Sequence, residues 1–242
     1  MIRENFKRET LLNGAVIGAV ISVIAIVIGA CIRDVVIVPE WVQTGGEMSD
    51  IILIDPGHGG FDGGAVASDG TVEKDINLAI SLPLADILRV LGYNVDITRD
   101  SDAALDEQGI TTIRGRKVSD MRNRLEQYNQ SRMVISIHQN HFTQAQYYGT
   151  QVIYGGSTAE STILAESIRQ TVGSLLEQPR LRELKKGSRD VFLLHNADVP
   201  VVLVECGFLS NSAERERLKN VEYQHQMAFS IACGIILHGI YN

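Results

Sequence analysis

The stretch IILIDPGHGG, residues 51–60, decides the fold and the position of the first functional residues. Its apolar run IILI is typical of a buried strand in a parallel sheet. Two more short apolar runs, MVISI at 133–137 and VVLV at 201–204, also end beside residues that bind metals or move protons. The three runs lead to Asp55 and His58, to His138, and to Glu205. Because ligands in open α/β sheets bind beyond the carboxyl ends of the strands, we expect these side chains to converge.

Strand-like and helix-like segments alternate from residue 50 to the end of the chain. This alternation predicts an α/β fold, with one three-layer domain and a mostly parallel or mixed central sheet of about six strands. We expect strands at 50–55, 93–98, 132–138, 149–154, 190–194 and 201–205, and helices at 74–91, 114–129, 158–177 and 221–240. Pro83 should kink or interrupt the first of these helices. Roughly 190 residues suffice for one well-filled core and leave no room for a second catalytic domain.

Residues 10–32 carry no charged side chain over 23 positions, which is enough to cross a hydrocarbon core of about 30 Å. Three basic residues, Arg3, Lys7 and Arg8, precede this segment. The charged residues that follow it, up to position 50, are one basic residue, Arg33, and the acidic residues Asp34, Glu40, Glu47 and Asp50. The positive-inside rule therefore places the following domain outside the cytoplasm. We predict a cytoplasmic N-terminus (1–9), a transmembrane anchor or signal segment (10–32), a linker (33–49) and a catalytic domain (50–242). Cys31 ends a lipobox-like sequence, so a lipoprotein and a secreted form are the alternatives.

Four residues in or beside these segments are candidates for catalytic chemistry. His58 lies between two glycines and has no strand or helix face on which to pack, which favours metal binding over a core position. Glu73 opens a helix-like segment after a glycine-rich loop, and taken alone it would be an ordinary first-turn carboxylate. With His138, these residues match the two imidazoles and one carboxylate of a catalytic zinc that keeps a position for water. Glu205 follows four apolar residues, which should raise its pKa and suit it to proton transfer. The structural alternative is a buried ion pair with Arg189 or another basic residue.

Four sequence blocks also carry a family resemblance: DPGHGG at 55–60, Glu73 downstream, SIHQN at 136–140 and LVECGFLSN at 203–211. Over about residues 50–240 the chain resembles the zinc-dependent N-acetylmuramoyl-L-alanine amidases of the amidase_3 type, and most of all the germination-specific cortex amidases of spore formers. The resemblance implies Zn²⁺ held by His58, Glu73 and His138, with Glu205 as the catalytic base. It further implies hydrolysis of the bond between N-acetylmuramic acid and L-alanine in peptidoglycan, and a role in forming muramic-δ-lactam in spore cortex.

Other polar residues near these blocks receive smaller roles. We expect Asp55 to orient His58, as carboxylates orient metal-bound imidazoles in many proteins. His141 departs from the family pattern, which usually has a small residue there, and it either contacts substrate or lies free on the surface. His195, His225 and His238 are assigned no role. Cys206 is interpreted as a small buried hydrophobic residue.

The net charge of −7 argues against a nucleic-acid partner, because phosphate binding needs a basic surface. The expected partners are peptidoglycan and, through the N-terminal helix, a membrane; whether a protein activates the enzyme is left open. Two other functions compete: a zinc peptidase or deacylase acting on a different wall peptide, and an inactive wall-binding module. The presence of both a ligand trio and Glu205 argues against the inactive module.

Overall fold

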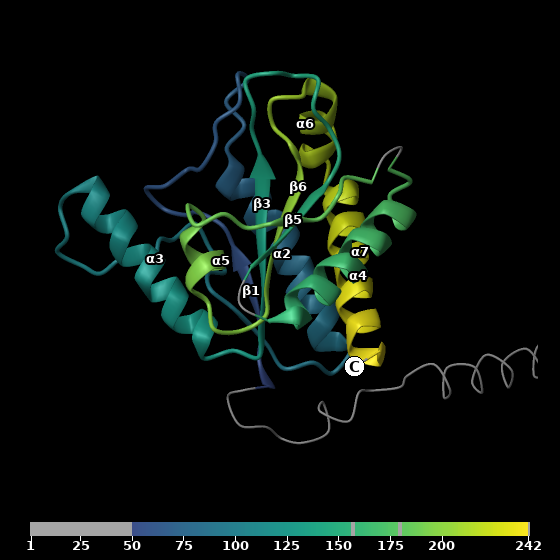
Figure 1. The fold of residues 1–242 in the computed structure, drawn as a ribbon. Coiled ribbons are helices and arrows are strands. Elements are labelled where there is room, and N and C mark those ends of the chain that lie inside the picture. Colours follow the sequence, from purple (N-terminus) through teal and green to yellow (C-terminus); the bar gives the residue numbers. More distant parts are fainter. Residues whose placement is uncertain (1–49, 156–157, 179–180, 242) are drawn as a thin grey trace, which may run out of the picture. The chain divides into compact units, whose positions relative to one another are not determined.

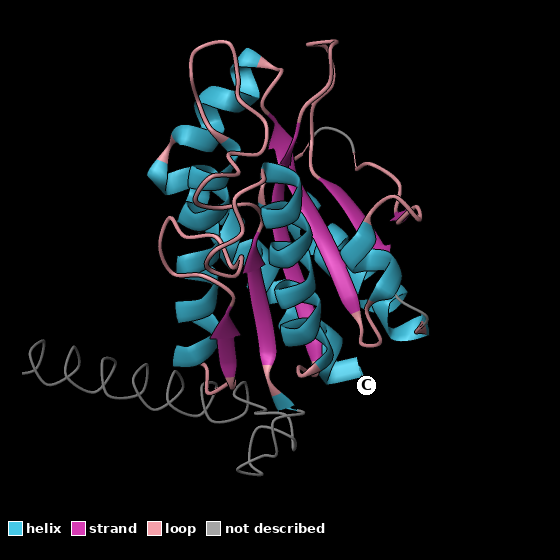
Figure 2. Cartoon of the chain, turned by 90° about the vertical axis from the view of Figure 1, so that its left-hand side faces the viewer, coloured by secondary structure: helices cyan, strands magenta, loops and turns pink. Residues whose placement is uncertain are grey.

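The computed structural model describes residues 50–155, 158–178 and 181–241. These residues form an α/β domain in which one six-stranded mixed sheet lies between two layers of helices (Figures 1 and 2). The predicted fold class of this domain is confirmed. The predictions for residues 1–49, including the membrane helix at 10–32 and the lipobox at Cys31, lie outside the described residues. Among the helices that are described, none has the length and hydropathy needed to cross a membrane.

The central strands of the sheet run in the same direction, so their carboxyl ends lie together at one end of the sheet, called the carboxyl edge below. Its order is β2-β1-β3-β6-β4-β5. The strands are β1 (Ile52–Pro56), β2 (Val95–Ile97), β3 (Met133–Asn140), β4 (Gln151–Gly155), β5 (Lys185–Lys186) and β6 (Val201–Phe208). Strands β2, β1, β3 and β6 are parallel, whereas β4 runs antiparallel to β6 and pairs in parallel with β5. The start of β4 therefore lies beside the end of β6, at the edge where the candidate residues are expected.

Helices cover both faces of the sheet. They are α2 (Glu73–Val90), α3 (Ile113–Asn129), α4 (Ala159–Leu175), α5 (Phe192–Asn196), α6 (Ser212–Lys219) and α7 (Val221–Tyr241). Helices α2, α4 and α7 pack on one face and on one another, while α3 and α5 lie on the opposite face (Figure 1). The first face holds the larger apolar core, built around residues such as Ile54, Leu84, Ile168, Val204 and Ile231. The second core is smaller and leaves room near the carboxyl edge of the sheet.

The secondary-structure predictions are wrong for one strand, miss two elements, and wrongly expect an interruption at Pro83. The expected strand at 190–194 is the short helix α5, because an apolar run of this length fits a strand and a buried helical turn equally well. Strand β5 was not predicted, because it consists of two exposed lysines and shows no apolar run or alternation. Helix α6 was not predicted, because it is polar and has no apolar periodicity. Asn211 is its N-cap, and its Oδ1 accepts hydrogen bonds from the amides of residues 213 and 214. Pro83 does not interrupt α2, which runs continuously through it.

A buried carboxylate ties α3 to the segment that leaves β1. Asp55 is fully buried and accepts hydrogen bonds from Thr98 Oγ1 at 2.7 Å, Ser136 Oγ at 2.9 Å and Tyr128 OH at 2.5 Å, and it pairs with Arg124. Burial alone would raise the pKa of Asp55, but Arg124 and the hydroxyl donors outweigh it and lower the pKa to about 2. Arg124 also donates to the backbone oxygens of Pro56 at 3.1 Å and His58 at 2.7 Å. The network thus fixes the backbone on which the first histidine stands.

Asp55→Asn should lower the free energy of unfolding by about 3–5 kcal/mol, because it leaves the buried Arg124 without its carboxylate partner. Asp86→Asn is the matched control: its carboxylate pairs with Arg89 at the surface, where an ion pair contributes at most about 1 kcal/mol. Urea unfolding of the purified full chain measures both. The stabilisation from Asp55 should be complete above its ordinary pKa of 3.8 and disappear as the pH falls through about 2. Equal effects of the two substitutions would contradict this assignment.

Candidate metal centre

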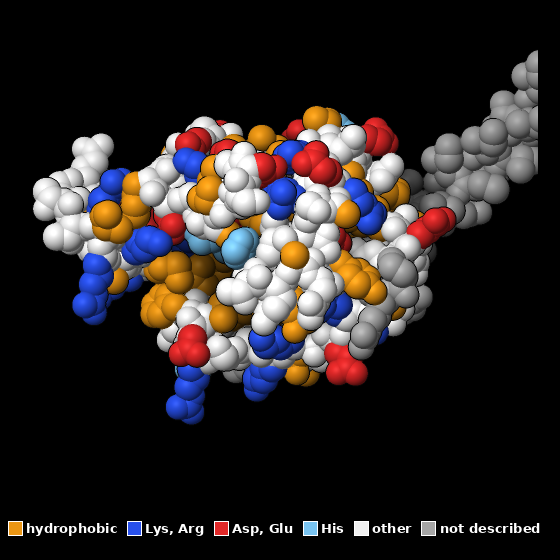
Figure 3. Space-filling view, turned by 90° about the horizontal axis from the view of Figure 1, so that it is seen from above, with side chains coloured by type: hydrophobic (Ala, Val, Ile, Leu, Met, Phe, Trp, Pro, Cys, Tyr) orange, Lys and Arg blue, Asp and Glu red, His pale blue; other side chains and the backbone are white. Residues whose placement is uncertain are grey.

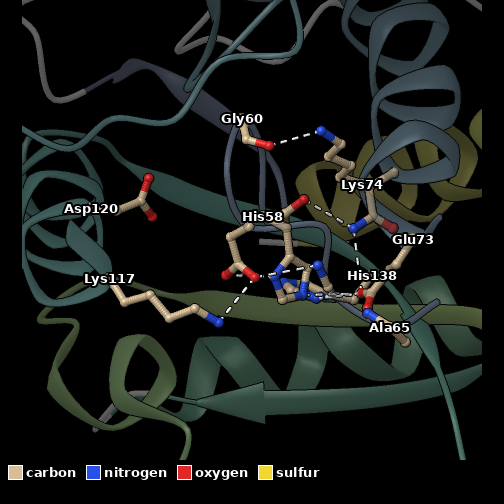
Figure 4. A network of polar contacts seen from close by, with 12 residues as sticks. His58, Gly60, Ala65, Glu73, Lys74, Lys117, Asp120 and His138 are labelled. Atoms are coloured by element: carbon tan, nitrogen blue, oxygen red, sulfur yellow. Dashed lines mark hydrogen bonds and ion pairs between the residues drawn. The ribbon is translucent and has the colours of Figure 1, made fainter. Parts of the chain in front are cut away.

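Three side chains from separate segments meet at the carboxyl edge of the sheet. His58 lies in the loop after β1, Glu73 is the first residue of α2, and His138 lies near the end of β3. Glu73 Oε1 is 3.3 Å from His58 Nε2 and 3.0 Å from His138 Nδ1, and one ligand atom from each residue lies within 4.8 Å of the other two (Figure 4). The structure therefore brings together the three residues predicted as metal ligands.

Glycines allow these side chains to approach. His58 itself has a positive φ of 63°, an unusual conformation for a residue with a side chain. A Cβ at Gly57 would lie 2.2 Å from the imidazole of His138, and one at Gly64 would lie 2.6 Å from Glu73 Oε2. The loop thus folds against the ligands so closely that only glycine fits at these two positions.

The carboxylate of Glu73 is held firmly by the surrounding backbone. Its Oε2 accepts a hydrogen bond from the amide of Ala65 at 2.8 Å, and its Oε1 accepts one from the amide of Gln139 at 3.1 Å. Burial would raise the pKa of Glu73, but the two histidines lower it well below its usual range. An ionised carboxylate oxygen aimed at the same point as two imidazole nitrogens is a donor set that suits a divalent metal such as zinc. The residues present therefore fit the metal that the sequence predicts.

Asp62, and not Asp55, contacts the imidazole of His58. Asp62 Oδ2 is 3.1 Å from His58 Nδ1, and Asp62 Oδ1 accepts hydrogen bonds from Lys117 Nζ at 3.0 Å and from the amide of Gly64 at 3.3 Å. Burial would lower the pKa of His58, but its bonds to Asp62 and Glu73 raise it to about 9. The prediction that Asp55 orients this imidazole is wrong, since Asp55 reaches His58 only through Arg124 and the backbone oxygen. The position of Asp62, four residues after His58 in the same loop, is the signal that would have identified it.

Glu205 lies next to His138 on the neighbouring strand, where the two residues are paired in register. The residue is half-buried, and its Oε2, which is buried, has no hydrogen-bond partner among the described residues. Burial is the main cause that raises its pKa, to about 7, while His138 lowers the pKa and Glu73 raises it. Arg189 is exposed and makes no ion pair with Glu205, so the structural alternative considered for this carboxylate is not seen in the described residues. A carboxyl group with this pKa can take up and release a proton near neutral pH.

The surface is hollowed beside the cluster. A hollow of about 260 Å³ is lined by both histidines and by apolar side chains that include Met121, Phe192 and Leu203. Figure 3 shows histidine side chains at this end of the molecule, with hydrophobic side chains around the depression beside them. His141 is exposed just beyond β3. Cys206 is buried as predicted and, like Cys233, is a free thiol.

Comparison with known proteins identifies the family. The Amidase_3 profile, whose description is N-acetylmuramoyl-L-alanine amidase, matches residues 52–236. The chain belongs to this family. It is 37% identical over 188 residues to the germination-specific N-acetylmuramoyl-L-alanine amidase of Bacillus subtilis (strain 168), a match that covers 77% of the chain and 78% of that protein. This N-acetylmuramoyl-L-alanine amidase is thus a hydrolase of peptidoglycan, as the sequence predicts.

Solved structures of amidases show the same fold. The CwlD amidase from Clostridioides difficile, solved in complex with the GerS lipoprotein, superimposes with a TM-score of 0.77 at 36% identity, covering 80% of this chain and all of that one. The amidase AmiC2 of Nostoc punctiforme gives a TM-score of 0.63 at 31% identity, covering 80% of this chain and 98% of its own. Both structures are matched over nearly their full length, so the described domain corresponds to a whole amidase domain.

Gly57→Ala should weaken metal binding by roughly tenfold or more, because the added methyl group displaces the imidazole of His138. Gly63→Ala is the matched control in the same loop, since its Cβ would meet only Val72 Cγ1, at 3.2 Å. The zinc affinity of each purified full-length variant, measured by competition with a chromogenic chelator, tests this. Unchanged affinity in Gly57→Ala would show that the close approach does not position the ligand.

Proposed function

We propose that this amidase is a zinc enzyme in which His58, Glu73 and His138 hold the metal and Glu205 is the general base. The observation that supports it best is that Glu205, paired in register with His138, has a buried carboxyl oxygen with no hydrogen-bond partner among the described residues. An unpartnered buried carboxyl oxygen reduces stability, so its presence here indicates a functional role. A module that only binds the cell wall has no need of it.

Each residue then has a defined part in hydrolysis. A bound zinc would lower the pKa of a water molecule and polarise the carbonyl oxygen of the scissile amide. Glu205 accepts a proton from the attacking water and returns it to the leaving nitrogen, so that the carbon–nitrogen bond breaks. The products are the lactyl carboxylate of N-acetylmuramic acid and the free amino group of L-alanine. Asp62 keeps the imidazole of His58 in orientation throughout, through its bond to Nδ1.

Glu205→Gln should reduce turnover on the order of 10² to 10⁴-fold, because the amide cannot accept the proton, while one zinc per chain is retained. Turnover is measured as new L-alanine amino termini released from peptidoglycan, and zinc as bound metal in the same sample. Glu222→Gln, an exposed carboxylate on α7 outside the metal cluster, serves as the control and should keep its turnover. Near wild-type release by Glu205→Gln would transfer the base role to another group.

We also propose that the substrate is spore-cortex peptidoglycan. The similarity to a germination-specific amidase of Bacillus subtilis and to the CwlD amidase of Clostridioides difficile supports this. Complete removal of a stem peptide frees the lactyl carboxylate that closes the ring of muramic-δ-lactam. Deletion of the gene in its host should therefore abolish lactam in cortex muropeptides, measured by mass spectrometry. Unchanged lactam would refute the cortex role and leave the amidase chemistry intact.

We further propose that the domain is held outside the cytoplasm by an uncleaved helix at residues 10–32. The support is the uncharged length of this segment and the excess of basic residues before it. A reporter fused after Asn242 should give an extracytoplasmic signal, and the mature chain should keep its N-terminus. If fatty acid labels the wild type but not Cys31→Ala, the anchor is a lipid on Cys31 and the helix proposal is wrong. A cytoplasmic reporter signal would show that the orientation is the opposite one.

A further inference from the structure

A second and larger hollow lies on the other side of Glu205. It measures about 800 Å³ and is lined by Gln146, Tyr147, Tyr148, Gln151, Leu181, Arg182 and Glu183. Gln151 is the antiparallel partner of Glu205 in the sheet, so the two side chains project from the same face about 5 Å apart at their bases. The hollow therefore begins directly beside the proposed base. Its volume is in the range of sites that bind small ligands.

Hydrogen bonds link the residues that form the wall of this hollow. Gln151 Oε1 accepts a hydrogen bond from Arg182 Nε at 2.9 Å, and Gln151 Nε2 donates to the backbone oxygen of Glu183 at 2.6 Å. Arg182 also donates to the backbone oxygen of Tyr148 at 3.3 Å, and its guanidinium lies 5.1 Å from the centre of the Phe208 ring. These contacts join the loop before β4 to the segment before β5. Such preorganisation lowers the entropy lost on binding.

The groups left accessible in this hollow suit a neutral, hydroxyl-rich ligand. Tyr148 is 45% exposed and its ring makes no aromatic contact with another described residue, whereas Tyr147 packs in a T-shaped contact against Phe142. Gln146 is exposed and offers both a donor and an acceptor. The formal charges of the lining residues Arg182 and Glu183 cancel. A sugar needs such groups, because one face of its ring carries C–H bonds that pack on an aromatic side chain and its edge carries hydroxyl groups.

The smaller hollow beside His58 has a different character. Its polar lining groups Asp55, Arg124, Tyr128 and Ser136 hydrogen-bond with one another, so they are not free for hydroxyl groups. The rest of its wall combines apolar side chains with the carboxylates Asp62, Asp120 and Asp190, of which Asp62 is paired with Lys117 and Asp120 with Arg124. The two hollows therefore differ: this one carries several carboxylates, whereas the formal charges that line the larger one cancel.

We propose that the hollow lined by Tyr148, Gln146 and the Gln151–Arg182 wall binds the glycan of the substrate. The sugar rings lie on the β4–β5 side of Glu205, and the stem peptide extends over the α3–α5 side. This inference rests on the proposed function, since it places the two halves of the peptidoglycan substrate around the same reactive centre. The exposed ring of Tyr148 stacks on a sugar face, and Gln146 hydrogen-bonds to its edge.

Calorimetric titration of the full chain with the peptide-free disaccharide N-acetylglucosaminyl-N-acetylmuramic acid, whose lactyl carboxylate is capped as an amide so that the probe is neutral, tests the proposal without relying on turnover. Tyr148→Ala should weaken disaccharide binding by about tenfold, because it removes the stacking surface, and Tyr148→Phe should bind as the wild type does. Phe229→Ala is the matched control: Phe229 is 52% exposed on α7, outside the lining of the hollow, and its removal should change nothing. Binding of the dipeptide L-alanyl-D-glutamate should be the same in all four proteins.

If Tyr148→Ala binds the disaccharide as tightly as the wild type does, the proposal is overturned. Weakened dipeptide binding in Tyr148→Ala would overturn it in another way, by assigning the hollow to the peptide. Loss of disaccharide binding in Phe229→Ala as well would show that the effect is not local, and it would also refute the assignment. Because binding is measured directly, a failure of the proposed hydrolysis would appear separately, as a wild-type protein that binds the disaccharide but releases no L-alanine amino termini.

Discussion

The carboxylate of Glu73 is the constraint on which the rest of the site depends. One oxygen lies between the imidazoles of His58 and His138, and the other accepts a hydrogen bond from the glycine-rich loop. This single side chain thereby joins the start of α2, the loop after β1 and the end of β3. A buried carboxylate needs compensation for its lost hydration, which the two imidazoles and two backbone amides provide here. A divalent metal would take over the same role, and this explains why the arrangement suits one.

The remaining structure supports this constraint from two sides. Below it, the Asp55–Arg124 pair fixes the backbone oxygens that lead into His58. Beside it, Asp62 holds the free nitrogen of the same imidazole and is itself bound by Lys117 from α3. Helix α3 therefore stabilises the cluster through two separate ion pairs, although it contributes none of the three ligands. Glu205 stands outside these pairs, and burial is the main cause of its raised pKa, although His138 and His58 lower the pKa in part.

Much of this could be predicted from the sequence, because the relevant signals are local. Short apolar runs lead to His58, His138 and Glu205 and place these residues at or just after the carboxyl ends of strands, and parallel pairing then brings them together. The failures occurred where a contact joins distant segments or where the local signal is ambiguous. Nothing local shows that Asp55 pairs with an arginine 69 residues away, which removes it from the imidazole. The short helix α5 read as a strand for a similar reason, since only tertiary packing decides the conformation of so short an apolar run.

The central claim is that zinc is held by two imidazoles and one carboxylate beside a free base. X-ray absorption at the zinc edge of the purified full chain tests it most directly, because the spectrum reports the type and number of the ligand atoms. We predict two imidazole nitrogens at about 2.0–2.1 Å, oxygen ligands for the rest of the shell, and no sulfur. A sulfur neighbour at about 2.3 Å, or a shell with a single imidazole, would contradict the assignment of His58, Glu73 and His138.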